Sequence, residues 1–222
     1  MAERRPLSTE PDVPALRAAV TASLQAGELC VLPTETVYGL TVLPSHAAAV
    51  ERARRFKGRD AAQPFTWHVA DARQVEQLGG ELTLPAKRLI ERYWPGPLTL
   101  ILKGRDGATI GVRQPAHDFT ASVIEACGEP LWMTSVNDRG QPPRTEPDDI
   151  AAFCGDEVSI FVDDGPSPLG MASTIVRADG GELQVLREGI LSRDEVLSSA
   201  ADLILFVCTG NTCRSPRRSR AS

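Results

Sequence analysis

Hydrophobic residues recur along the chain with two different spacings, which predict alternating helices and strands. One helix face is marked by apolar residues three or four positions apart: Val13, Leu16, Val20 and Leu24. Short apolar or β-branched runs predict strands at residues 29–32, 65–69, 98–102, 109–113, 131–134, 158–162, 173–177 and 183–187. Further helices are predicted at residues 46–56, at residues 118–127 and after four capping residues: Asp71, Thr83, Thr145 and Ser192.

Two pairs of these strands are separated by segments with turn composition. One segment joins strands 98–102 and 109–113, and an Ala-Asp-Gly-Gly turn joins the last two strands. Both hairpins would place neighbouring strands antiparallel, so the predicted fold is α/β with a twisted mixed β-sheet flanked by helices. Strand 98–102 is predicted to be buried on both faces.

The composition is typical of one globular domain. The chain has 222 residues, of which 42% are hydrophobic and 24% charged, so it can bury one sizeable core. We expect this domain at residues 11–200, after a disordered lead-in at residues 1–10. The net charge of −5 excludes an overall basic field, so any anion site must be local.

The cysteines and the apolar runs indicate a cellular compartment. The five cysteines are an odd number and form no CxxC pair, so neither a disulfide framework nor a structural zinc site is expected. The N-terminal residues contain no apolar signal region, and no apolar run approaches the length of a membrane span. We therefore expect a cytoplasmic protein without membrane contact.

The most polar of the predicted loops follows the first buried strand. Residues 29–40 read LCVLPTETVYGL, in which Pro33 ends the strand and hydrogen-bonding side chains follow it. Gly39 is predicted to let the backbone turn. A polar loop at the end of a buried strand is where open α/β sheets bind their ligands.

A basic run follows at residues 52–59, where five of eight residues are Lys or Arg. Such a run is usually a solvated helix face. The alternative is an anion cradle, because Gly58 between Lys57 and Arg59 suits a loop better than a helix. Charge alone leaves both interpretations open.

Seven motifs in order distinguish these interpretations. PTETVYGL and KGR are followed by WPGPLTLIL at 94–102, GVRQP at 111–115, TSVN at 134–137, STIV at 173–176 and LREG at 186–189. Over residues 12–198 the chain thus resembles the YrdC-like threonylcarbamoyl-adenylate synthase family. The resemblance implies a YrdC-like sheet with a concave, locally basic nucleotide cleft.

The resemblance also implies a reaction. L-threonine, bicarbonate and ATP would give threonylcarbamoyl-AMP and pyrophosphate, and other proteins would pass the product to the tRNA adenosine next to the anticodon. ATP would act as a substrate with Mg²⁺, without an organic cofactor or a dedicated protein metal site. Contact of this domain with tRNA itself is not required.

Site residues follow from the same resemblance. Lys57 and Arg59 would be catalytic, and the ATP-binding residues would be Lys57, Arg59, Ser135, Asn137 and Arg187. The threonine-binding residues would be Thr36, His68, Arg113 and Ser173, with Arg113 holding the carboxylate. Taken singly, each has a structural alternative, such as a packed histidine, a turn hydroxyl or a surface arginine.

The chain departs from the family's motifs at one position near the expected phosphate site, and two other classes of function are possible alternatives. Asp60 stands where the family favours proline and would place a negative charge beside a phosphate site. A non-catalytic RNA-binding module is one alternative, which the acidic net charge disfavours. A carbamoyl-transferring relative is the other. The polar loop at residues 138–149 is a candidate lid, or a plain surface loop.

The last twenty residues have a different pattern. ILFVCTGNTCRSP at 204–216 resembles the opening of a low-molecular-weight protein tyrosine phosphatase, with Cys208 as thiolate and Arg214 as phosphate clamp. We interpret residues 203–222 as a truncated, vestigial phosphate loop. Because no later aspartic acid can serve as general acid, no phosphatase activity is expected.

Overall fold

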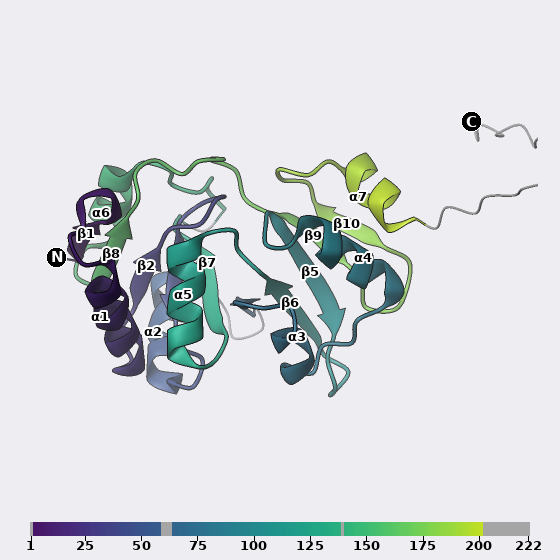
Figure 1. Cartoon of the computed structure of the whole chain (residues 1–222), viewed down its shortest axis with the longest axis horizontal. Coiled ribbons are helices and arrows are strands. Elements are labelled where there is room, and N and C mark those ends of the chain that lie inside the picture. Colours follow the sequence, from purple (N-terminus) through teal and green to yellow (C-terminus); the bar gives the residue numbers. More distant parts are fainter. Residues whose placement is uncertain (1, 59–63, 139, 202–222) are drawn as a thin grey trace, which may run out of the picture.

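The computed structural model describes residues 2–58, 64–138 and 140–201. Within these residues, ten strands form a single sheet in the order β1-β8-β2-β3-β7-β4-β6-β5-β9-β10 (Figure 1). The strands are β1 Glu3–Pro6, β2 Cys30–Leu32, β3 Gly39–Val42, β4 Thr66–His68, β5 Leu98–Lys103, β6 Thr109–Arg113, β7 Leu131–Ser135, β8 Ile160–Asp163, β9 Thr174–Arg177 and β10 Gln184–Arg187. The helices are α1 Val13–Gln25, α2 Ala47–Phe56, α3 Gln74–Gln77, α4 Leu84–Tyr93, α5 Asp118–Cys127, α6 Pro147–Cys154 and α7 Arg193–Ala200, besides a short 3₁₀ turn at Leu7–Thr9.

The sheet is mixed, as the two hairpins predicted. β5 pairs antiparallel with β6, and β9 pairs antiparallel with β10. Parallel pairs lie between β1 and β8, β2 and β8, β4 and β6, and β5 and β9. The prediction of an α/β domain with a mixed sheet flanked by helices is therefore confirmed.

Local capping rules explain several of the helix ends. The Thr83 hydroxyl accepts from Ala86 N, and Ser192 with Glu195 makes a full capping box at α7. Two predicted caps are wrong, because the N-cap positions of α3 and α6 are held by Arg73 and Glu146 rather than by Asp71 and Thr145.

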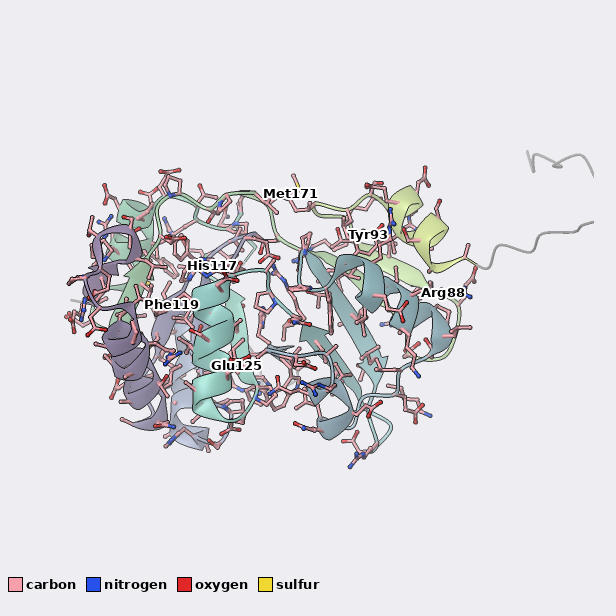
Figure 2. All side chains as sticks on the ribbon, viewed as in Figure 1. Arg88, Tyr93, His117, Phe119, Glu125 and Met171 are labelled. Carbon is pink, nitrogen blue, oxygen red and sulfur yellow. The ribbon has the colours of Figure 1, made fainter. Side chains whose placement is uncertain are left out.

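Helices cover the two halves of the sheet differently. Around β2, β3, β7 and β8, α1 and α5 pack on the front face in Figure 1, and α2 and α6 pack on the back. Around β5, β6, β9 and β10, one core cluster lies under α3, α4 and α7. Tyr93 of α4 lies 2.7 Å from Ser199 Oγ of α7, which joins these two helices (Figure 2).

Successive side chains of β5 point to opposite faces of the sheet, so one set lies in the core and the other set lies on the second face. Leu98, Leu100 and Leu102 all lie in the core cluster. Thr99 and Ile101 point the other way and line a cavity. Strand 98–102 is thus largely buried, as predicted, but its second face is a cavity wall and not a second packed core.

The sequence predicts a disordered lead-in at residues 1–10, but residues 3–9 are ordered. Residues 3–6 form β1, which pairs in parallel with β8 at the edge of the sheet. The Arg4 guanidinium is 2.8 Å from Asp163 and 2.6 Å from Asp148. A charged strand carries no hydrophobic periodicity, so its pairing could not be recognised from the sequence.

Gly39 has a different role from the predicted turn. It begins β3, which no strand pattern had predicted, and pairs with both Leu32 and Ser135. A Cβ at this position would lie 2.4 Å from Met133 Cε. Gly39 therefore gives the Met133 side chain room to pack on the strand.

Gly189 permits a close approach of two backbone segments beside β9. A Cβ there would lie 2.1 Å from Ala172 O, 2.7 Å from Ser173 C and 2.8 Å from Thr174 N. Because these are backbone atoms, they can move only together with the strand. We therefore expect Gly189→Ala to lower the free energy of unfolding by about 1–3 kcal/mol, measured by urea unfolding.

Gly181→Ala is the matched control, because its Cβ would meet nothing nearer than Asp179 Oδ1 at 4.0 Å. Equal stabilities of the two variants would show that the close approach at Gly189 is not a constraint on the fold.

Candidate active site

A cavity of about 270 Å³ opens on the second face of the strands described above. Its wall contains five residues that the sequence singled out, namely His68, Arg113, Ser135, Ser173 and Arg187. They come from β4, β6, β7, the start of β9, and β10, which are far apart in the chain. Residues one position away, such as Trp67 beside His68 and Val112 beside Arg113, pack in or against the core cluster on the opposite face. Strand alternation thus holds polar side chains on a rigid wall.

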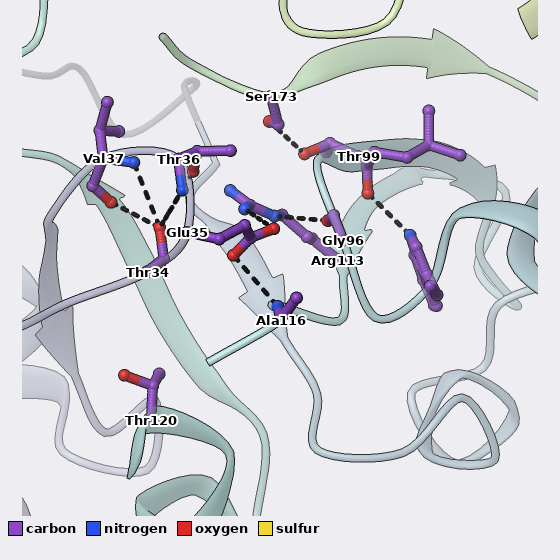
Figure 3. Close-up of polar contacts among 12 residues, drawn as sticks. Thr34, Glu35, Thr36, Val37, Gly96, Thr99, Arg113, Ala116, Thr120 and Ser173 are labelled. Carbon is purple, nitrogen blue, oxygen red and sulfur yellow. Dashed lines mark hydrogen bonds and ion pairs between the residues drawn. The ribbon is translucent and has the colours of Figure 1, made fainter. Parts of the chain in front are cut away.

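Arg113 is the most tightly held cation of this wall. Its side chain is 6% exposed, and its Nη2 donates to Glu35 Oε1 at 2.6 Å (Figure 3). Its Nε donates to Gly96 O at 3.1 Å. Burial lowers the pKa of Arg113, and the neighbouring Glu35 carboxylate opposes that shift.

His68 lies on the same wall as a neutral imidazole. Burial, assisted by the nearby positive charge of Arg113, lowers the pKa of His68 to about 3. Its Nδ1 is 3.1 Å from Thr66 O. Because a carbonyl can only accept, Nδ1 carries the hydrogen and Nε2 is an acceptor. His68 can therefore receive a hydrogen bond from a ligand without adding charge to the cavity.

Ser173 is fixed from two sides. Arg187 donates to its carbonyl oxygen from Nη2 at 2.8 Å and from Nε at 3.3 Å. The Ser173 hydroxyl is 2.8 Å from the Thr99 hydroxyl, and both side chains line the cavity (Figure 3). Two hydroxyls that share one hydrogen bond have one hydrogen left over, which a ligand oxygen could accept.

Lys57 organises the turn after β7. Its Nζ donates to Ser135 O at 2.8 Å, to Asn137 Oδ1 at 2.7 Å and to Asn137 O. Ser135 Oγ donates to the same Asn137 Oδ1 at 2.8 Å. Gly58 follows with φ +55, so the helix ends where the sequence suggested. Lys57 is only 5% exposed, so it does not belong to a solvated helix face.

The predicted residues thus form two connected groups. Lys57, Ser135 and Asn137 make one hydrogen-bonded group, and Ser135 also belongs to the cavity wall with the other predicted residues. Thr36 is fully buried, with its hydroxyl 2.9 Å from that of Thr34, and it is Thr34 that lines the cavity. Four other residues discussed above lie outside the described part of the chain: Arg59, Asp60, Cys208 and Arg214.

Sequence reasoning missed three residues of the site. Glu35 was noted only as a polar loop residue, although it pairs with Arg113. Tyr38 donates to Gly165 O at 2.5 Å and accepts from Asp164 N at 2.8 Å, which fastens residues 164–165 beside the cavity. Thr99 was the one residue that a signal could have found, because it is the only polar residue within strand 98–102.

Comparison with known proteins assigns the chain to a family. A family model described as Telomere recombination, which covers the Sua5, YciO and YrdC proteins, matches residues 22–189. The chain belongs to this family. The threonylcarbamoyl-AMP synthase of Bacillus subtilis is 32% identical over 189 residues, which cover 81% of this chain and 55% of that protein.

Two solved structures of Sua5/YciO/YrdC proteins share the fold. Pyrococcus abyssi Sua5 in complex with L-threonine superposes with a TM-score of 0.80 at 30% identity, over 90% of this chain and 60% of that one. Escherichia coli YciO superposes with a TM-score of 0.75 at 25% identity, over 86% and 97%. The chain spans about half the length of the first curated relatives it matches.

The buried neutral state of His68 predicts an acid-dependent loss of stability. Between pH 6.5 and about 3 the unfolded chain binds a proton at this histidine that the folded chain does not bind. The free energy of unfolding should therefore fall as the pH falls through this range, by at most about 1.4 kcal/mol per pH unit. His68→Gln should show a shallower fall in urea unfolding between pH 7 and pH 5. His46→Gln, at a half-buried histidine before α2, should match the unmodified protein.

The Lys57 contacts predict a structural effect as well as a functional one. Lys57→Met keeps the length of the side chain but removes the donor from Ser135 O and both Asn137 oxygens. We expect a loss of about 1–3 kcal/mol in the free energy of unfolding, because three partly buried acceptors lose a charged donor. Arg55→Ala, at an exposed position of the same helix, should stay within about 0.5 kcal/mol. An unchanged melting temperature for Lys57→Met would contradict the organising role.

Proposed function

We propose that this chain makes threonylcarbamoyl-AMP and pyrophosphate from L-threonine, bicarbonate and ATP. The amine of threonine takes up carbon dioxide from bicarbonate to form a carbamate. A carbamate oxygen then attacks the α-phosphorus of ATP, and pyrophosphate leaves as the new P–O bond forms. No protein nucleophile is required, so the site has to position two anionic groups and a triphosphate in line.

One observation supports this function above all others. Arg113, Arg187, His68 and Ser173 converge on the wall of one cavity, with Glu35 as the carboxylate bound to Arg113. Two guanidinium groups against one carboxylate leave a positive balance, and the neutral His68 adds none. Such a cavity suits a small anionic ligand with several hydrogen-bonding groups. A relative with this fold has been solved with L-threonine.

The roles of the site residues are part of the proposal. His68, Arg113 and Ser173 bind threonine, and Arg113 takes its carboxylate. Arg187, Ser135, Asn137 and Lys57 bind or position the nucleotide, together with Arg59, which is catalytic with Lys57. Thr36 acts on threonine through its contact with Thr34. Mg²⁺ enters with ATP, bridged by the phosphates.

The cellular setting is proposed on the same basis. The product goes to proteins that modify the tRNA adenosine next to the anticodon, in the cytoplasm. In the part of the chain that the structure describes, no helix has the length and apolar character to cross a membrane. The phosphatase-like sequence around Cys208 adds no phosphatase activity.

The direct test is release of pyrophosphate from ATP by the purified chain. Release should require both L-threonine and bicarbonate, because the attacking group is the carbamate that they form together. Serine should support a slower reaction, since recognition of one methyl group is worth only about 1–3 kcal/mol. Mass spectrometry of the product should show threonylcarbamoyl-AMP.

Two results would contradict this function. One is ATP breakdown at the same rate without threonine. The other is tight RNA binding by a chain that releases no pyrophosphate under any of these conditions, which would instead support the non-catalytic RNA-binding module. Lys57→Met cannot serve as the inactive control, because that change also affects stability. Arg187→Ala can serve if its melting curve matches that of the unmodified protein, since Arg187 also donates to Ser173 O.

A further inference from the structure

Glu35 connects three segments of the chain, one of which carries Arg113 of the cavity wall. Its Oε1 accepts from Arg113 Nη2 at 2.6 Å, and its Oε2 accepts from Ala116 N at 3.0 Å (Figure 3). Its backbone oxygen accepts from Leu169 N at 3.1 Å. One residue of the β2–β3 loop thus connects the end of β6, the turn before α5 and the segment that leads to β9.

These contacts decide which part of Arg113 faces a ligand. The guanidinium has donors on Nε, Nη1 and Nη2. Gly96 O takes Nε and Glu35 takes Nη2, so both atoms on one edge of the plane are engaged. Within the described residues, Nη1 makes no hydrogen bond. The side chain is therefore clamped along one edge, which leaves Nη1 and the second hydrogen of Nη2 to contact a ligand.

We propose that Glu35 is a positioning residue that orients Arg113 for the carboxylate of the amino-acid substrate. The inference rests on the proposed function, in which Arg113 takes that carboxylate. Glu35 itself contacts no substrate. It fixes the plane of the guanidinium, so that substrate binding need not order a long, flexible side chain.

The alternative role for Glu35 is that of a simple counter-ion. A buried ion pair is weak evidence for stability, because desolvation of both charges offsets their attraction. Removing only the negative charge would leave Arg113 more attractive to a carboxylate. The two roles therefore predict opposite effects on threonine affinity, which makes them separable.

Two substitutions of Glu35 show whether the position or the charge of its carboxylate matters for threonine binding. In the carboxylate, Oε1 accepts from Arg113 Nη2 and Oε2 accepts from Ala116 N. Glu35→Gln replaces one of these oxygens by an amide NH2, which can only donate, so one of the two donors loses its partner. Glu35→Asp keeps the charge but shortens the side chain by one methylene group, which moves the carboxylate away from Arg113. If position matters, both variants should be impaired, although only the first lacks the charge.

The experiment measures binding by calorimetry, with L-threonine and with L-threoninol, which lacks the carboxylate. We expect both Glu35 variants to bind threonine at least about tenfold more weakly, with their affinity for threoninol unchanged. In an Arg113→Ala background, Glu35→Gln should cause no further loss, because Glu35 acts through Arg113. Glu81→Gln, which removes an exposed carboxylate paired with Lys103, is the matched control and should bind as the unmodified protein does.

Several results would overturn the inference. If Glu35→Gln binds threonine as tightly as the unmodified protein, or more tightly, then Glu35 acts only as a counter-ion. Equal losses for threonine and threoninol, or a further loss in the Arg113→Ala background, would show a general structural role. If Glu35→Gln does not fold, as judged by its melting curve, Glu35→Asp decides alone. Failure of the unmodified chain to bind threonine would instead refute the proposed function, and the inference with it.

Discussion

A buried guanidinium group needs hydrogen-bond acceptors from the protein, because water cannot reach it. Around this cavity, the need of Arg113 for such acceptors determines how the neighbouring segments are arranged. With only 6% of its side chain exposed, Arg113 cannot rely on water, so Glu35 and Gly96 O take two of its donors. The ion pair between Glu35 and Arg113 holds the β2–β3 loop against the end of β6. The same Glu35 also holds Ala116 N and Leu169 N. One electrostatic constraint thereby sets the spacing of three chain segments around the cavity.

The strands place polar residues without loss of the core. Along β5 and β6 the core residues alternate with residues of the cavity wall, so each strand contributes to both. In β10 an irregularity in the strand pairing separates the core residue Val185 from Arg187 of the wall. Side chains on strands are held more firmly than side chains on loops, which suits a reaction that depends on positioning. Thr99 and Arg187 hold Ser173 in this way, one through its hydroxyl and one through its backbone.

The electrostatics of the cavity agree with a site for anions. Burial and Arg113 keep His68 neutral, with a pKa of about 3, so the imidazole provides an acceptor beside the cations. Lys57 donates hydrogen bonds to Ser135 O and Asn137 Oδ1. It therefore stabilises the turn after β7 and also places a positive charge near the site. Glu35 offsets one of the two arginine charges on the wall, so one net positive charge remains to balance a ligand.

The sequence by itself determined the features that depend on neighbours in the chain. Thr83 and the Ser192–Glu195 box cap their helices, both hairpins pair as predicted, and the motifs identify the family. Only the tertiary structure decided what depends on distant partners. Glu35 meets Arg113 across 78 residues, and Lys57 meets Asn137 across 80. The charged strand β1, which has no apolar pattern, pairs with β8. Hydrophobic periodicity reports local geometry and burial, but it cannot name the partner of a buried charge.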